Sequence, residues 1–361
     1  MNVIRHSVLI HESWEHILSR SITSPADLAQ VLDVNTSEIE RVASQYPMRI
    51  NPYYFGLIEK KGDPIYMQAV PDIREITRQE GLEDPLNEED LSPVPGLTHR
   101  YPDRVLFLVS SRCAMYCRFC NRKRKVGRNS MVTPESVKDG ISYIKGNKKI
   151  RDVLLSGGDP LLLSDRELDS ILGKLRSISH VQIIRIGTRV PCTLPQRITP
   201  RLVNMLRRYQ PLYINTHFNH PAEITPEASL ACQRLADGGM PLGCQTVLLR
   251  GVNDNPGIMR DLMQKLLLIR VRPYYLFQAD QAKGTSHFWT PLETGLNIIS
   301  KLQGYTSGLC VPHFVIDLPG GGGKVPLLPE YLLAVEKTHL VVRNYQGEKF
   351  LYPLVGSDNA L

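Results

Sequence analysis

Three of the chain's seven cysteines lie close together in the stretch CAMYCRFC, with the spacing CxxxCxxC. A structural zinc site usually takes four ligands in two pairs, and no second cysteine or histidine pair lies nearby. A disulfide framework is disfavoured because the number of cysteines is odd and the other four are scattered singly. Three thiolates in a short loop suit a [4Fe–4S] cluster that leaves one iron open for a small ligand. We therefore interpret Cys113, Cys117 and Cys120 as cluster ligands, with zinc and buried structural cysteines as alternatives.

The same stretch opens a strongly basic segment. Seven basic residues and no acidic one lie between Arg112 and Arg128, which equals the formal net charge of +7 for the whole chain. Such a segment is a solvated loop, a site for nucleic-acid phosphates, or a site for small anionic ligands, and charge alone does not choose between them. Arg118, between the cysteines, does not have the character of a core residue. Only Tyr116 and Phe119 could stack on bases in this segment, which disfavours RNA binding.

Glycines mark two further stretches, SGGDP and PGGGGK. Glycine lets the backbone approach a ligand closely and donate hydrogen bonds to it. The second stretch is not a phosphate-binding P-loop, because that motif reads GxxxxGK[ST], whereas Val325 and Pro326 follow Lys324 here. The glycines leave the backbone around Lys324 open, which is unlike the surroundings of an ordinary surface lysine.

Alternating strands and helices must position these residues. The candidate strands are VLFLV (105–109), DVLLS (152–156), VQIIRI (181–186), LYINTHF (212–218), CQTVLL (244–249), PYYLFQ (273–278) and HFVID (313–317). The helical segments between them are 133–145, 165–175, 199–209, 229–238 and 257–269. This order predicts βαβ units and a parallel sheet, and so many units favour a partial or complete (β/α) barrel of the TIM type. No GxGxxG opens a helix after the first strand, which disfavours a dinucleotide fold.

Every unusual motif follows one of these strands. The cysteine loop, SGGDP, GTRVP, HFNHP, RGVND, QADQAKG and LPGGGGK come in this order after the seven strands. Barrel enzymes build their active sites at the carboxyl ends of the strands. We therefore expect the motifs to share one site.

Length and composition describe an ordinary globular protein of 361 residues, with 42% hydrophobic and 22% charged residues. We expect a mostly helical N-terminal region with its connection (1–98), a barrel (99–330) and a C-terminal extension (331–361). No apolar run approaches the length of a membrane span, and the N-terminal stretch MNVIRHSVLI is too short and soon too polar for a signal peptide. We expect a cytoplasmic protein, where thiols stay reduced, without membrane or nucleic-acid partners.

Eight segments together resemble the lysine 2,3-aminomutase family of radical S-adenosylmethionine (SAM) enzymes. They are HRYPDRVLFL, CAMYCRFC, LSGGDPLL, RIGTRVP, LPQRITP, NTHFNHP, LLRGVND and PGGGGK. The resemblance runs from about residue 50 to about residue 345 and follows the family's order. It implies a radical SAM barrel with three cofactors, namely a [4Fe–4S] cluster, SAM and pyridoxal 5′-phosphate (PLP).

The resemblance also assigns roles to individual residues. The cluster would be held by Cys113, Cys117 and Cys120. SAM would be contacted by Gly157, Gly158, Asp159, His217 and Gln245. Lys324 would bind PLP covalently, and the pyridoxal ring and phosphate would be held by Arg100, Tyr101 and Arg104. A salt bridge from Arg104 to Asp103 is the alternative for that arginine.

The resemblance implies conversion of L-lysine to β-lysine by migration of the amino group from C2 to C3. Arg122 would bind the substrate α-carboxylate, and Asp280 and Asp317 would hold the side-chain ammonium. Because the glutamate-acting relatives should lack this acidic pair, the pair favours lysine as the substrate. The reaction would need an electron donor such as flavodoxin or ferredoxin, and the family implies a homo-oligomer.

Several features depart from the family or leave alternatives. Longer members carry C-terminal zinc cysteines, but the last cysteine here is Cys310, so we expect no such zinc site. Phe119 and Phe277 stand where histidine and tyrosine are expected. The alternatives are an aminomutase for another amino acid and a relative that acts in β-lysylation of an elongation factor, which Lys324 disfavours. A zinc- and RNA-binding protein is the distant alternative.

Overall fold

The structure, a computed structural model, describes residues 12–78, 80–128 and 131–355. The stretch MNVIRHSVLI lies outside these residues. The region before the first strand is helical, as expected: its helices are α1 (Trp14–Ser19), α2 (Pro25–Val31), α3 (Thr36–Gln45), α4 (Pro52–Phe55), α5 (Pro64–Ala69) and α6 (Arg74–Thr77). The side chains of Ser24 and Asn35 cap α2 and α3 by accepting hydrogen bonds from backbone N–H groups of the first turn.

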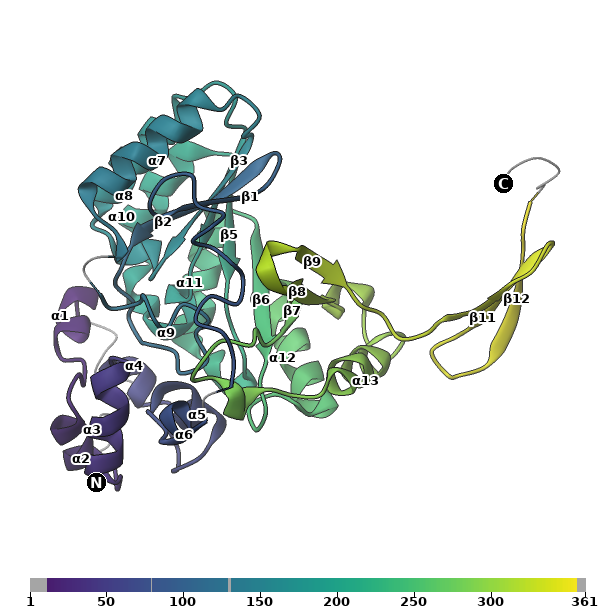
Figure 1. The fold of residues 1–361 in the computed structure, drawn as a ribbon, viewed down its shortest axis with the longest axis horizontal. Helices are drawn as coiled ribbons and strands as arrows, with labels where there is room; N and C mark the ends of the chain where they lie inside the picture. Colours follow the sequence, from purple (N-terminus) through teal and green to yellow (C-terminus); the bar gives the residue numbers. More distant parts are fainter. Residues whose placement is uncertain (1–11, 79, 129–130, 356–361) are drawn as a thin grey trace.

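One nine-stranded sheet, in sequence order from β1 to β9, forms the body of the molecule (Figure 1). Its strands are β1 (Leu97–Tyr101), β2 (Arg104–Ser110), β3 (Asp152–Gly157), β4 (Ile183–Gly187), β5 (Leu212–Thr216), β6 (Leu242–Leu248), β7 (Arg272–Gln278), β8 (His313–Leu318) and β9 (Gly323–Pro326). Strands β2 to β8 are parallel to their neighbours, whereas β1 and β9 are antiparallel edge strands. The predicted parallel barrel is therefore confirmed, and its curved sheet is nearly closed.

Helices on the outside of the sheet connect the strands and bury its outer face. They are α7 (Pro134–Gly146), α8 (Asp165–Arg176), α9 (Val190–Thr193), α10 (Pro200–Leu206), α11 (Pro226–Asp237), α12 (Pro256–Leu268) and α13 (Leu292–Leu302). Helix α8 buries Leu168, Ile171, Leu172 and Leu175, the spacing of a single helix face, and Ser164 begins it with a capping box. The core therefore lies between helices and sheet, while the inner face of the sheet is free to line a site. Within the described residues, no helix is long and apolar enough to cross a membrane.

The two edge strands were not expected from the sequence. No strand was expected before residue 105, but Leu97 pairs with Phe107, so β1 and β2 form a hairpin that turns after Tyr101. Strand β9 likewise folds back on β8, and Lys324 pairs with Asp317 within it. The backbone N–H of Lys324 donates to Tyr101 Oη at 3.0 Å, so the two edges meet at a seam. The domain boundary proposed after residue 98 falls inside β1.

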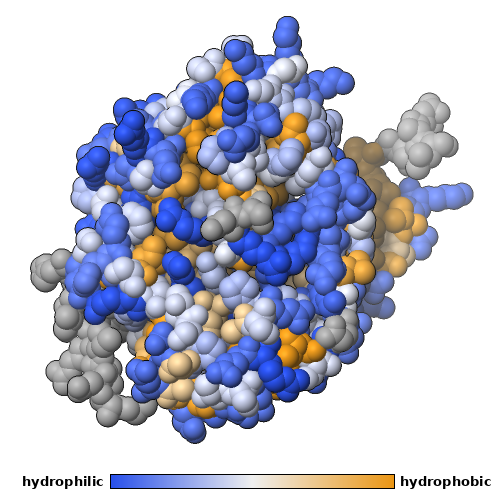
Figure 2. Space-filling view, turned by 60° about the vertical axis from the view of Figure 1, so that its left-hand side comes forward, coloured by the Kyte–Doolittle hydropathy of each residue, from blue (hydrophilic) through white to orange (hydrophobic). Residues whose placement is uncertain are grey.

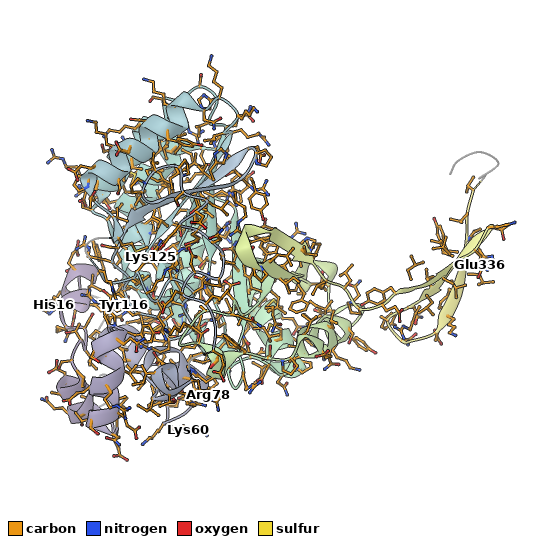
Figure 3. The ribbon with its side chains drawn as sticks, viewed as in Figure 1. His16, Lys60, Arg78, Tyr116, Lys125 and Glu336 are labelled. Carbon is orange, nitrogen blue, oxygen red and sulfur yellow. The ribbon has the colours of Figure 1, made fainter. Side chains whose placement is uncertain are left out.

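The C-terminal residues form a separate three-stranded antiparallel sheet, which projects from the body as an arm (Figure 1). Its strands are β10 (Leu332–Val335), β11 (His339–Arg343) and β12 (Lys349–Pro353). Figure 3 places Glu336 far out on this arm, whereas Tyr116 and Lys125 lie in the body. The face of the body shown in Figure 2 is largely hydrophilic, with scattered apolar patches.

Candidate active site

A cavity of about 710 Å³ lies inside the barrel and at the carboxyl ends of its strands. The residues predicted for the site all line it: Cys113, Cys117, Cys120, Gly157, Gly158, Asp159, His217, Gln245, Arg100, Tyr101, Arg104, Arg122, Asp280, Asp317 and Lys324. The expectation that every motif shares this site is wrong for RGVND, because residues 250–254 do not line the cavity. The side-chain amide of Asn253 donates to the backbone carbonyls of Asn219 and Val247, which holds that turn away from it.

The three clustered cysteines lie in the loop after β2 and are free thiols. Burial raises the pKa of Cys113 well above its ordinary value and that of Cys120 to about 11, and neighbouring thiols add to both shifts. Among the described residues, no three His, Cys, Asp or Glu side chains are arranged to hold a metal ion. The donor set nevertheless fits a [4Fe–4S] cluster, because three soft sulfur ligands face one cavity. Iron would replace the protons that burial keeps on Cys113 and Cys120.

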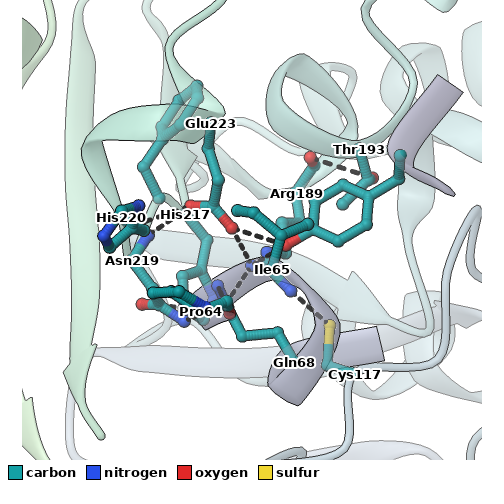
Figure 4. Close-up of polar contacts among 12 residues, drawn as sticks. Pro64, Ile65, Gln68, Cys117, Arg189, Thr193, His217, Asn219, His220 and Glu223 are labelled. Carbon is teal, nitrogen blue, oxygen red and sulfur yellow. Dashed lines mark hydrogen bonds and ion pairs between the residues drawn. The ribbon is translucent and has the colours of Figure 1, made fainter. Parts of the chain in front are cut away.

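Arg189 after β4 ties the cysteine loop to the rest of the site (Figure 4). Its Nη1 donates to Cys117 Sγ at 2.8 Å, and its Nη2 donates to Glu223 Oε1 at 2.7 Å and to Gln68 Oε1 at 2.6 Å. The guanidinium also lies 5.1 Å from the centre of the Phe119 ring. Gln68 belongs to α5, so the N-terminal helices help to hold the cavity wall. The sequence marked this arginine only as part of GTRVP, and its network was missed.

The glycines of SGGDP serve packing more directly than ligand contact. Gly157 has a φ of +132°, and a Cβ on it would lie 2.2 Å from the carbonyl oxygen of Ser110. A Cβ on Gly158 would lie 2.4 Å from the carbonyl oxygen of Arg112. The turn therefore sits against the backbone that leads into the cysteine loop, and only glycine allows this approach.

Asp159 and His217 are both buried polar residues of the cavity wall. The carboxylate of Asp159 accepts hydrogen bonds from Thr188 Oγ1 and the backbone N–H of Arg189, both at 2.7 Å, which locks two loops together. Burial raises the pKa of Asp159 to about 6. Burial, with the charge of Arg189, lowers the pKa of His217 to about 3, so its imidazole is neutral at physiological pH.

Lys324 sits at the seam between the edge strands. Its Nζ donates to Asp317 Oδ2 at 2.7 Å, and Arg100 Nη1 donates to Asp317 Oδ1 at 2.6 Å. In the described structure Arg100 Nε is buried without a hydrogen-bond partner, which fits an anionic group bound at the seam. Arg104 lies 3.9 Å above the ring of Tyr101 and pairs with Asp103 at 2.9 Å, the alternative left open for it.

Arg122 and Asp280 face the cavity from neighbouring loops. Arg122 donates from Nε and Nη2 to Glu88, with distances between 2.5 and 3.0 Å. The carboxylate of Asp280 accepts from Asn121 Nδ2 at 2.7 Å. Burial raises the pKa of Asp280 to about 6, and the nearby charge of Asp317 adds to the shift.

The basic segment is paired with acidic residues of the N-terminal region. We call residues 82–91 the acidic strap. Its Asp84, Glu88 and Glu89 form ion pairs with the basic segment, and so does Glu75 of α6. Arg118 is 1% exposed and binds Glu75 through two hydrogen bonds, so the expectation that it lacks core character is wrong. The run LEDPLNEEDL was the signal for this pairing, since its acids mirror the basic segment.

Comparison with known proteins relates most of the chain to one group of enzymes. It matches the family model described as lysine-2,3-aminomutase over residues 299–355 and the radical SAM superfamily model over residues 107–262. It is 51% identical to an L-lysine 2,3-aminomutase of Fusobacterium nucleatum, across 92% of this chain and 80% of that protein. An L-lysine 2,3-aminomutase of Methanococcus maripaludis is 53% identical, across 92% and 79%. A glutamate 2,3-aminomutase of Clostridioides difficile is 44% identical, across 93% and 82%.

Proposed function

The chain belongs to the lysine 2,3-aminomutase family of the radical SAM superfamily, and from this premise we propose that it converts L-lysine to β-lysine. One observation carries the proposal: a single cavity holds the three thiols, Lys324, an arginine anchor at Arg122 and a buried carboxylate at Asp280. An amino acid with a cationic side chain could place its α-carboxylate at Arg122 and its side-chain cation at Asp280.

The cavity residues fit the three cofactors of this reaction. When bound, the cluster with SAM supplies radical chemistry, and PLP supplies a covalent hold on the substrate amine. Cys113, Cys117 and Cys120 would hold the cluster. Lys324 would bind PLP beside Arg100, whose Nε has no hydrogen-bond partner among the described residues. The carboxylate of Asp317 touches Lys324 Nζ and is placed to take a proton from it.

The chain's own residues orient the substrate and exclude water. Arg122 binds the α-carboxylate, because a guanidinium offers several donors in one plane. The carboxylate of Asp280 accepts hydrogen bonds from the side-chain ammonium of the substrate. Asp317, also expected to bind that ammonium, is engaged by Arg100 and Lys324 in this structure, so its part in substrate binding stays a prediction. The cavity lies inside the barrel, whose walls help to keep solvent away from reactive intermediates.

Glutamate is the second candidate substrate, because the Clostridioides difficile relative acts on it. A second carboxylate at the far end of the substrate would approach the carboxylate of Asp280, and like charges in a buried site repel. This repulsion favours lysine over glutamate.

Partners and assembly belong to the same proposal. The reaction needs a one-electron donor, for which a flavodoxin or ferredoxin is suited, and the chain acts as a homo-oligomer built through its projecting arm. Seven free thiols suit the reducing cytoplasm. We keep the division into 1–98, 99–330 and 331–361 as a proposal, although its first boundary falls inside β1.

The test is turnover by the loaded enzyme. The protein is reconstituted anaerobically with iron, sulfide and PLP, supplied with SAM and dithionite, and offered lysine, glutamate and other amino acids in turn. β-Lysine should form from lysine. Turnover of a different amino acid in place of lysine would overturn the substrate assignment.

The same preparation tests Lys324. Lys324→Ala should abolish turnover, because the amine that binds PLP is gone. Borohydride reduction should leave PLP attached to the peptide that contains Lys324 in the wild type, and mass spectrometry should find no such label in the variant. Full activity of the variant would refute the assignment, and Lys337→Ala on the exposed arm is the matched control.

A further inference from the structure

The acidic strap presents one carboxylate to the cavity, that of Glu88. It accepts three hydrogen bonds from Arg122: Nε to Oε1 at 3.0 Å, Nε to Oε2 at 2.9 Å and Nη2 to Oε1 at 2.5 Å. In the part of the chain that the structure describes, Nη1 of Arg122 makes no hydrogen bond. One edge of the guanidinium is therefore taken by Glu88, and the other is left for a ligand in the cavity.

The strap is fastened on both sides of Glu88, so Glu88 is not a loose surface side chain. After Glu88, the carbonyl of Leu91 accepts from the backbone N–H of His99 at 2.9 Å. The backbone of Leu82 exchanges hydrogen bonds with Gln281 and Lys283 in the loop after β7. The carbonyl of Leu86 accepts from Arg100 Nη2 at 3.0 Å, and Asp84 pairs with Arg124 at 3.0 Å. The strap thus spans from the loop of Asp280 to the cysteine loop, across the substrate end of the cavity.

Because the ion pair between Glu88 and Arg122 is buried, a ligand cannot easily replace either partner. The side chains of Glu88 and Arg122 are 6% and 17% exposed. Burial raises the pKa of Glu88, but the charge and hydrogen bonds of Arg122 outweigh it, so the pKa of Glu88 lies below its ordinary value. A buried carboxylate deprived of its cation is strongly disfavoured, so the pair should persist while a ligand binds.

We propose that Glu88 is a positioning residue for the substrate carboxylate: it fixes the Nε–Nη2 edge of Arg122 so that Nη1 faces the α-carboxylate of the bound amino acid. This inference rests on the proposed function, in which Arg122 is the carboxylate anchor. A long arginine side chain has many rotamers, and a fixed partner on one edge selects a single orientation before the substrate arrives. The strap thereby couples recognition of the amino acid end of the substrate to the N-terminal region.

The test compares two ligands that differ only at the carboxylate. Isothermal titration calorimetry on the cluster- and PLP-loaded enzyme, with SAM but without reductant, gives the Kd of L-lysine and of L-lysinamide, which lacks the carboxylate charge. Glu88→Gln should raise the Kd of lysine by roughly 10- to 100-fold, because the anchor loses its orientation. The Kd of lysinamide should stay within about twofold of the wild-type value.

Two further variants keep the result interpretable. Glu89→Gln is the matched control, because Glu89 lies next to Glu88 on the strap but is 61% exposed and pairs with Arg124 and Lys125. Its Kd for lysine should equal that of the wild type. Glu88→Asp keeps the charge on a shorter side chain and should restore part of the affinity. Thermal melting checks that each variant is folded. If Glu88→Gln does not fold, the Kd values of lysine and lysinamide are compared between Glu88→Asp and the wild type instead.

The outcomes separate this inference from the proposed function. Equal losses for lysine and lysinamide would show a merely structural role for Glu88. A lower Kd for lysine in Glu88→Gln would show that Glu88 competes with the substrate for Arg122. Either result would overturn the inference about Glu88 but leave the proposed function intact, provided that the wild type converts lysine. A wild type that neither binds nor converts lysine refutes the proposed function instead.

Discussion

At the scale of single residues, most charges around the cavity are arranged in ion pairs, whereas Asp280, like Asp159, has no cation paired with it among the described residues. Arg122 is matched by Glu88, and Asp317 is matched by Arg100 and Lys324. The hydrogen-bond partner of Asp280 is the neutral amide of Asn121. Burial therefore raises the pKa of Asp280 to about 6. A cation from the substrate would complete this pair.

The raised pKa of Asp280 predicts how substrate affinity depends on pH. Below its pKa of about 6 the carboxyl is neutral and loses its attraction for an ammonium group, whereas above it the carboxylate is charged. The KM of the wild type for lysine should therefore rise as the pH falls below 6, approaching about tenfold per pH unit. Steady-state kinetics between pH 5 and 8 measure this. Asp280→Asn should bind lysine weakly at all these pH values, and an unchanged pH profile in that variant would refute the role of Asp280.

At the scale of elements, the cysteine loop is held by segments far away in the chain. Glu75 on α6 is buried and binds both Arg118 and Lys123 of that loop. Burial alone would raise the pKa of Glu75, but the two cations outweigh it and lower the pKa to about 2. Helix α6 is therefore clamped to the loop that carries the three thiols, and the N-terminal region is part of the site.

Glu75→Gln should destabilise the protein by about 3–5 kcal/mol, because two buried cations would share a neutral partner. Chemical denaturation followed by circular dichroism measures this loss. Glu59→Gln, an exposed glutamate of the same region, should leave the free energy of unfolding unchanged. A Glu75→Gln variant as stable as the wild type would show that the clamp contributes nothing to folding.

The parallel strands and the site at their carboxyl ends could be predicted because their signals are local. Each strand is a short apolar run, and each motif follows one directly. The edge strands β1 and β9 could not be predicted in this way, because each becomes a strand only by pairing with the backbone of its neighbouring strand. The same limit applies to charges: the sequence showed the basic segment and the acidic run, but not that Arg118 would be buried against Glu75. Partners of buried polar groups depend on packing of the whole chain.

At the scale of the whole molecule, the arm formed by β10, β11 and β12 is a sheet without a core of its own. Val342 pairs with Phe350 and Leu340 with Tyr352 on one face, while Val341 pairs with Leu351 on the other. Phe350, Leu351 and Tyr352 are between 51% and 67% exposed. A small sheet needs a covered hydrophobic face to be stable, and exposed apolar patches of this kind mark interaction sites.

The arm predicts self-association of the chain, with a second copy covering its apolar faces. The wild type should elute as a dimer or larger oligomer in size-exclusion chromatography with light scattering. The double variant Phe350→Glu, Tyr352→Glu should shift the protein to a monomer, because two charges would be buried in the interface. Lys349→Ser on the same strand is the control and should leave the oligomer intact. A monomeric wild type would refute this role of the arm.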